Sequence, residues 1–174
     1  MSVTVISYSF TGNNEALAGS VAKELSAKHI RIAEPKSRTM GTITMDMIFN
    51  RTPQVQPAPE QLGQYDFILF FGPVWMGHVA APLRAYLKYL KKHPHKYGFL
   101  SISGGADGAN PKLAEEFRKR TGAAPAVLMD LHIADLLPDK VNAATRKETS
   151  AYQLKPGDLQ KLTGTIVDAL RDVL

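Results

Sequence analysis

Apolar runs of strand length alternate with amphipathic helical patterns along almost the whole chain of 174 residues, and this alternation strongly constrains the fold. The apolar runs that fit strands are residues 3–8, 30–33, 67–72, 99–103 and 126–131. Strands that alternate with helices form parallel sheets covered by helices on both faces. The sequence therefore predicts an α/β fold, with a doubly wound sheet of five parallel strands in one domain over residues 1–174.

The helical patterns are clearest where apolar residues recur on one face. Leu17, Val21 and Leu25 do so directly after the first strand. Three further helices are expected to open with a proline in the first turn, where the missing N–H has no helical partner to lose: Pro82, Pro111 and Pro156. Residues 35–63 are less regular, and a short helix is expected around residues 43–50.

The loop after the first apolar run has the composition of a phosphate-binding loop. A strand that ends in small hydroxyl residues and Gly turns backbone N–H groups inward, and the next helix adds its own unpaired N–H groups and positive dipole end. Gly12 allows close approach, and Ser9 and Thr11 offer hydroxyls. Asn13 and Asn14 either cap the helix or donate to phosphate oxygens. The alternative is an ordinary capped strand-to-helix turn.

Two further loops are expected at the same edge of the sheet, where ligands of such folds bind. Residues 73–77 include Trp75, the single tryptophan of the chain, which suits a flat aromatic ligand or else packs into the core. Residues 104–110 are rich in glycine, which allows a close approach to a ligand or forms a flexible turn. Together the three loops predict a mononucleotide site.

These loops make the chain resemble the flavodoxin family, whose members bind FMN. Residues 8–13 are similar to the phosphate loop of that family, residues 73–77 to its first flavin-flanking loop, and residues 103–105 to the start of its second. The resemblance covers nearly the whole chain and implies the strand order 2-1-3-4-5, with FMN between the first and third strands. The FMN-binding residues that it implies are Ser9, Phe10, Thr11, Gly12, Asn13, Asn14, Pro73, Val74, Trp75, Met76, Gly77, Ser103, Gly104, Gly105, Asp107 and Gly108.

Two residue patterns depart from that family. Asn14 stands where flavodoxins usually have Thr. The loop after Ser103 lacks the aromatic residue that many flavodoxins stack on the outer flavin face, and Asp107 is its only acid. An open flavin face suits a hydride donor or a quinone that stacks on the ring, so this departure weighs against a pure one-electron carrier.

The charge balance is a third departure, because typical flavodoxins are acidic and this chain has a net charge of +5. Much of the excess lies near the expected C-terminal ends of two helices, in Lys88, Lys91, Lys92, Lys96, Arg118, Lys119 and Arg120. We interpret these residues as a solvated surface that balances helix dipoles, remote from the flavin, with a partner site as the alternative. No nucleic-acid motif accompanies them, so nucleic acid is not an expected partner. Attraction to anionic membrane surfaces stays open.

Other residue types exclude several classes of chemistry. The chain has no Cys, which excludes disulfides, thiolate nucleophiles and Cys-held metals. His93 and His95 have no further ligands at metal-binding spacing, so no metal site is expected. No apolar stretch is long enough for a membrane span and no export signal is visible, so we expect a cytoplasmic protein.

The leading prediction is a redox protein that carries electrons through bound FMN. Its partners are a redox partner protein or, as the alternative, NAD(P)H and a quinone-like acceptor in a reductase; a homodimer is left open. A second alternative is a flavin-free binding module of the same fold. His78 either interacts with the flavin or caps a helix, and residues 132–155 are expected to form a lid or partner surface at the ligand edge.

Overall fold

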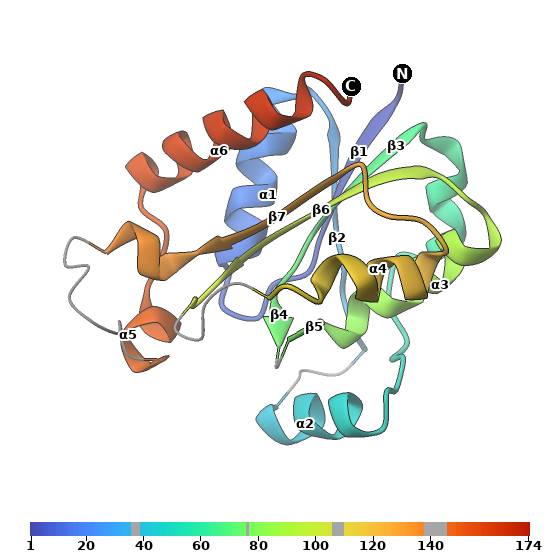
Figure 1. The fold of residues 1–174 in the computed structure, drawn as a ribbon, viewed down its shortest axis with the longest axis horizontal. Helices are drawn as coiled ribbons and strands as arrows, with labels where there is room; N and C mark the ends of the chain where they lie inside the picture. The colour runs from blue at the N-terminus through green and yellow to red at the C-terminus, as the bar shows by residue number, and fades with distance from the viewer. Residues whose placement is uncertain (36–38, 76, 106–109, 138–145) are drawn as a thin grey trace.

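A parallel sheet runs through the middle of the molecule (Figure 1). The computed structural model describes residues 1–35, 39–75, 77–105, 110–137 and 146–174. Over these residues the main sheet has five strands in the order β2-β1-β3-β6-β7, and every neighbouring pair is parallel. The strands are β1 (Val3–Ser7), β2 (Lys28–Arg31), β3 (Phe67–Phe71), β6 (Lys96–Ser103) and β7 (Val127–His132). Numbered by these strands alone, the order is 2-1-3-4-5, which confirms the predicted fold class.

Helices cover both faces of the sheet (Figure 1). One face packs against α1 (Asn13–Glu24) and α6 (Pro156–Leu170), and the other against α3 (Arg84–Lys92) and α4 (Leu113–Thr121). The remaining helical elements are α2 (Met40–Ile48), η1 (Pro59–Gln64), η2 (Ala81–Leu83), η3 (Ile133–Leu136) and α5 (Arg146–Ala151). Pro156 begins α6 as predicted, whereas Pro82 lies in η2 just before α3 and Pro111 precedes α4.

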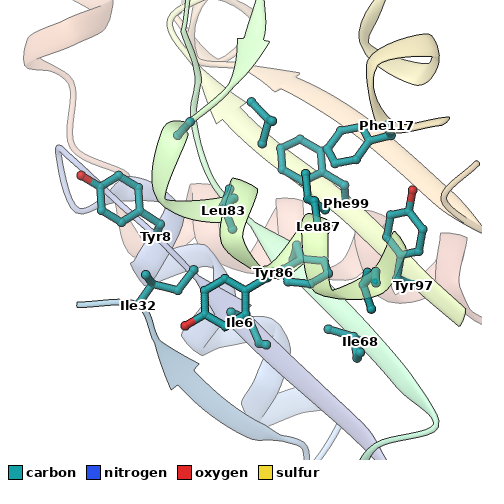
Figure 2. Packing of buried hydrophobic residues seen from close by; sticks show 14 of the residues in the cluster. Ile6, Tyr8, Ile32, Ile68, Leu83, Tyr86, Leu87, Tyr97, Phe99 and Phe117 are labelled. Carbon is teal, nitrogen blue, oxygen red and sulfur yellow. The ribbon is translucent and has the colours of Figure 1, made fainter. Parts of the chain in front are cut away.

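Both layers bury large apolar side chains against the sheet. All five residues of β3 are buried, which is why this strand reads as an unbroken apolar run. Figure 2 shows the α3 and α4 side, where Phe99 of β6 packs on Phe117 with ring centroids 4.4 Å apart. Tyr86 and Tyr97 extend the same cluster. Each fully buried side chain of this size contributes about 1.5–3 kcal/mol of transfer free energy.

Three differences from the predicted elements lie where the sequence has no clear apolar pattern. β2 begins at Lys28 and β6 at Lys96, earlier than the apolar runs, because exposed strand ends tolerate charged residues. A short antiparallel hairpin of β4 (Val74–Trp75) and β5 (His78–Val79) follows β3 and was not predicted. Strands of two residues are too short to leave a periodic pattern in the sequence.

Candidate functional site

The loops that follow β1, β3 and β6 meet at the carboxyl edge of the sheet. The Tyr8 N–H donates to the Phe71 carbonyl (2.9 Å), and the Gly72 N–H donates to the Leu100 carbonyl (3.1 Å). These bonds align the ends of the three strands. The edge where the strand order reverses, between β1 and β3, is where open α/β sheets bind ligands.

The loop between β1 and α1 is shaped by Gly12. Gly12 is the N-cap of α1 and has a φ of 95°, a left-handed conformation that favours glycine. Its N–H donates to Ser9 Oγ (2.9 Å), which closes the loop. No side chain of the described residues caps the helix, so its first-turn N–H groups have no capping acceptor there. Phe10 and Thr11 lie exposed beside them.

The side chain of Asn13 is buried and holds the C-terminal part of the chain. Asn13 Nδ2 donates to the Tyr152 carbonyl (2.8 Å), and Asn13 Oδ1 accepts from the Leu154 N–H (3.0 Å). Gln153, between them, donates from Nε2 to the Thr11 carbonyl (3.2 Å). Residues 152–154 therefore lie along the loop and fix its backbone.

The Asn14 side chain hydrogen-bonds to another backbone segment in the same way. Its amide accepts from the Ile102 N–H (3.0 Å) and donates to the Ile102 carbonyl (2.9 Å). These Ile102 groups face the position that β3 would occupy if it continued, but β3 ends at Phe71. Asn14 thus replaces a missing strand partner. Both Asn side chains are buried and hydrogen-bond to distant backbone groups, and neither caps α1, which was one of the two roles predicted for them.

Trp75 lies at the same edge, in contact with the loop after β1. Its ring is met edge-on by Tyr8 (centroids 5.9 Å apart) and by Phe10 (6.2 Å). Trp75 is partly buried against the core, and Phe10 is 46% exposed. Trp75 is therefore neither a fully buried plug nor a free side chain; with Phe10 it forms an apolar surface that suits a flat ring.

The start of the third loop is tightly packed. Gly105 has a φ of 75°, and a Cβ there would lie 2.4 Å from Cβ of His132, so glycine is required for both space and conformation. A Cβ on Gly104 would lie 2.7 Å from Thr149 Oγ1 of α5. The predicted site residues Met76, Asp107 and Gly108 lie outside the described residues.

The His78 side chain contacts a side chain of a helix and not the backbone groups at its end. His78 lies in β5, opposite Trp75 in the hairpin register, and its Nδ1 is 3.5 Å from Glu116 Oε1 of α4. Glu116 also accepts from the Val79 N–H (3.1 Å) and from Arg120 Nε (2.7 Å). Glu116 thus fastens the hairpin to α4.

Solved structures share this architecture. A flavoprotein from Lactobacillus acidophilus NCFM in complex with FMN matches with a TM-score of 0.59 at 18% identity, over 75% of this chain and 93% of that chain. A candidate flavoprotein from Bacteroides eggerthii DSM 20697 matches with a TM-score of 0.63 at 12% identity, over 95% and 98%. Oxidised flavodoxin 1 from Bacillus cereus matches with a TM-score of 0.51 at 16% identity, over 98% of both chains.

The fold is flavodoxin-like. No protein-family model matches the sequence, and no curated protein matches it. Identities below 20% explain why the flavodoxin-like fold is visible in three dimensions while sequence comparison alone finds no relative.

Within the flavodoxin-like fold, the structure brings together the predicted residues of all three loops that it describes. It adds a segment that the sequence did not assign to the site, residues 149–154, which we call the C-terminal strap. The strap touches the loop after β1 through Asn13 and Thr11 and lies beside Gly104. The only sequence signal was its position after the last strand, which placed it at the ligand edge.

The strap is anchored to the start of α6. The Tyr152 hydroxyl donates to Asp158 Oδ2 (2.7 Å), which also accepts from the Lys155 N–H (2.9 Å). The Lys155 N–H and then the Tyr152 hydroxyl lower the pKa of the Asp158 carboxyl. The same carboxylate raises the pKa of the Tyr152 hydroxyl through their hydrogen bond.

Two other kinds of feature are absent from the described ranges. None of the helices there combines the length and the apolar character that crossing a bilayer requires. Nor do three or more His, Asp or Glu side chains gather there as a metal site would need.

Proposed function

We propose that this protein binds FMN at the carboxyl edge of its sheet and acts as a redox protein through the bound flavin. The observation that carries the proposal is the uncapped start of α1 behind Gly12, beside the exposed ring of Phe10 and the partly buried ring of Trp75. An anion site next to a flat apolar surface fits the two ends of a flavin mononucleotide.

The residues present fit the phosphate end of FMN. Ser9 and Thr11 offer hydroxyls, and the main-chain N–H groups that follow Gly12 offer donors in the positive field of the helix. Asn13 and Asn14 contribute through these N–H groups and by fixing the loop in place. A cradle that is already shaped loses little entropy when the phosphate binds.

The ring end of FMN would lie against the other two loops. Pro73, Val74, Trp75 and Gly77 would flank the isoalloxazine on one side, and Ser103, Gly104 and Gly105 would face its pyrimidine end with main-chain groups. Met76, Asp107 and Gly108 remain proposals from the resemblance. When bound, FMN supplies the electron chemistry, while these residues hold and orient it and exclude water from one side.

The identity of the electron partners belongs to the proposal as well. The first candidate is a carrier that serves a redox partner protein. The second is a reductase that takes electrons from NAD(P)H to a quinone-like acceptor, favoured by the absence of aromatic residues from the sequence between Gly104 and Gly108. A homodimer and a cytoplasmic location stay predictions.

Paired titrations with FMN and riboflavin test the proposal. Because Trp75 is the single tryptophan, its fluorescence should be quenched as FMN binds. Thr11→Ala should weaken FMN binding by about ten- to a hundredfold, since hydrogen bonds to charged groups are worth about 1.5–3 kcal/mol. The same variant should leave riboflavin binding unchanged.

Thr165→Ala is the matched control, because Thr165 is exposed on α6 away from the loop. Equal affinities of the unaltered protein for riboflavin and FMN would disprove the phosphate cradle. No binding of either would favour the flavin-free module.

A further inference from the structure

A cationic groove of about 790 Å³ lies between α3, α4 and the residues that follow α2. Its cations are Arg84, Lys88, Lys91, Lys112, Lys119 and Arg120. The sequence led us to expect the basic helix ends to be a solvated surface remote from the candidate site. Of the residues in that prediction, Lys88, Lys91, Lys119 and Arg120 line the groove, together with Arg84 and Lys112 from nearer the starts of the two helices.

The groove is held in shape by internal contacts. Arg84 is buried, and its Nη1 donates to the carbonyls of Asp46 (3.1 Å) and Arg51 (3.2 Å), which ties α2 to α3. Arg120 bonds Glu116 and reaches Asn50 Oδ1 (3.3 Å). These two arginines therefore hold the walls of the groove together, whereas the lysines of the groove are exposed to solvent.

One end of the groove reaches the candidate site. His78 lines the groove and pairs in the hairpin with Trp75, whose ring forms part of the ligand edge. From Arg84 to Lys91 the groove follows α3 for about 10 Å, at about 1.5 Å per residue. A partner seated in the groove would therefore lie next to the flavin-flanking hairpin.

The lining favours a protein partner over a small molecule. Pockets for small ligands are mostly apolar and aromatic, but the described lining residues of this groove are all polar or charged. The carboxylate of Glu115, exposed within the groove, opposes a ligand made only of phosphates.

An apolar surface adjoins the groove. Met45, Ile48 and Phe49 at the end of α2 are 44%, 67% and 58% exposed, and Phe49 directly precedes Asn50 in the groove wall. Arg51 lies over the Phe49 ring, 5.2 Å from its centroid. Aromatic and Met side chains beside a charged rim are the composition of protein interfaces.

We propose that the groove and the apolar end of α2 together form the docking surface for an acidic face of a partner protein. Carboxylates of the partner would pair with Lys88, Lys91 and Lys119, and an apolar side chain of the partner would pack on Phe49. That the docked protein exchanges electrons with this one rests on the proposed function, but the docking itself needs no flavin.

The test measures binding of two fluorescein-labelled peptides by anisotropy, using the full-length protein without added FMN. In one peptide glutamates alternate with phenylalanines, and in the other serines replace the phenylalanines. The first peptide should bind more tightly. Reversing the charge at Lys88, Lys91 and Lys119 to Glu should weaken binding of both peptides by about tenfold. Phe49→Ser should weaken only the first.

In the control variant, Lys23, Lys28 and Lys161, which are exposed outside the groove, are replaced by Glu. This variant should change peptide binding by less than about twofold. Equal weakening by both triple variants would overturn the proposal, because net charge alone would then explain binding. Tighter binding of a single-stranded DNA of equal charge, unaffected by Phe49→Ser, would also overturn it in favour of a polyanion. Since FMN is absent, failure here leaves the FMN titrations untouched.

Discussion

Two buried serines of the sheet differ in the hydrogen bonding of their hydroxyl groups. Ser101 of β6 is fully buried, and its Oγ has no hydrogen-bond partner among the described residues. Ser7 of β1 is 2% exposed, and its Oγ lies 2.8 Å from Nε2 of His29. Burial of a hydroxyl without a partner costs free energy, whereas a paired hydroxyl recovers it.

We therefore predict opposite effects of the same substitution at these two sites. Ser101→Ala should leave the free energy of unfolding unchanged or raise it by about 1 kcal/mol, because no hydrogen bond is lost. Ser7→Ala should lower it by about 1 kcal/mol, because His29 loses its partner. Urea unfolding monitored by circular dichroism measures both. A loss of stability in Ser101→Ala equal to that in Ser7→Ala would contradict the prediction.

At this scale the sequence predicts residue types better than residue partners. Ser9, Thr11 and Gly12 were predicted as a loop from their local order, and the positive φ of Gly12 agrees with that reading. The roles of Asn13 and Asn14 could not be predicted, since their backbone partners lie 139 and 88 residues away. Local patterns carry no information on contacts at such separations.

Among the elements, the start of α6 joins the strap to the helix through one carboxylate. Asp158 accepts from the Lys155 N–H and from the Tyr152 hydroxyl, and both bonds favour its charged form. Its pKa is therefore below the ordinary value of 3.8. A lowered pKa stabilises the folded state at pH above the unfolded value, and this contribution disappears as the pH falls through the folded value.

We predict that Asp158→Asn lowers the free energy of unfolding at neutral pH by less than about 1 kcal/mol, because solvent screens the site. The difference from the unaltered protein should shrink below about pH 3.8. Urea unfolding at a series of pH values measures it. Asp168→Asn, in an exposed ion pair with Arg171 on the same helix, is the control for charge. A difference that stays constant down to pH 3 would argue against the proposed linkage.

The elements that sequence reasoning predicted are those with long buried faces. The strands β1, β3 and β6 were recognised because their apolar runs are buried on both sides of the sheet. The edge strand β7 is only partly buried along its length but keeps an apolar run. The hairpin of β4 and β5 and the helix α5 were not, because they are short and their positions depend on contacts with distant elements.

For the molecule as a whole, the open question is which partner reaches the flavin edge. Hydride transfer requires the nicotinamide to stack within about 3–3.5 Å of the flavin, which an uncovered face allows. If the loop between Gly104 and Gly108 leaves that face open, we predict that NADH or NADPH bleaches the flavin of the FMN-loaded protein. Stopped-flow absorbance measures the rate.

Free FMN mixed with the same reductants is the control, and the protein should accelerate bleaching above it. No acceleration with either reductant would exclude the reductase and leave the electron carrier. Accelerated or unchanged bleaching therefore distinguishes the reductase from the electron carrier, and neither outcome depends on binding in the cationic groove.

The hydrogen bonds between Asn13 and the C-terminal strap have a consequence for the synthesis of the chain. Residues 11–13 leave the ribosome about 140 residues before residues 152–154, which hydrogen-bond to them. A nascent chain therefore carries this loop without its support until the strap has been made. If the loop holds FMN as proposed, a chain that stops short of the strap is expected to hold it poorly.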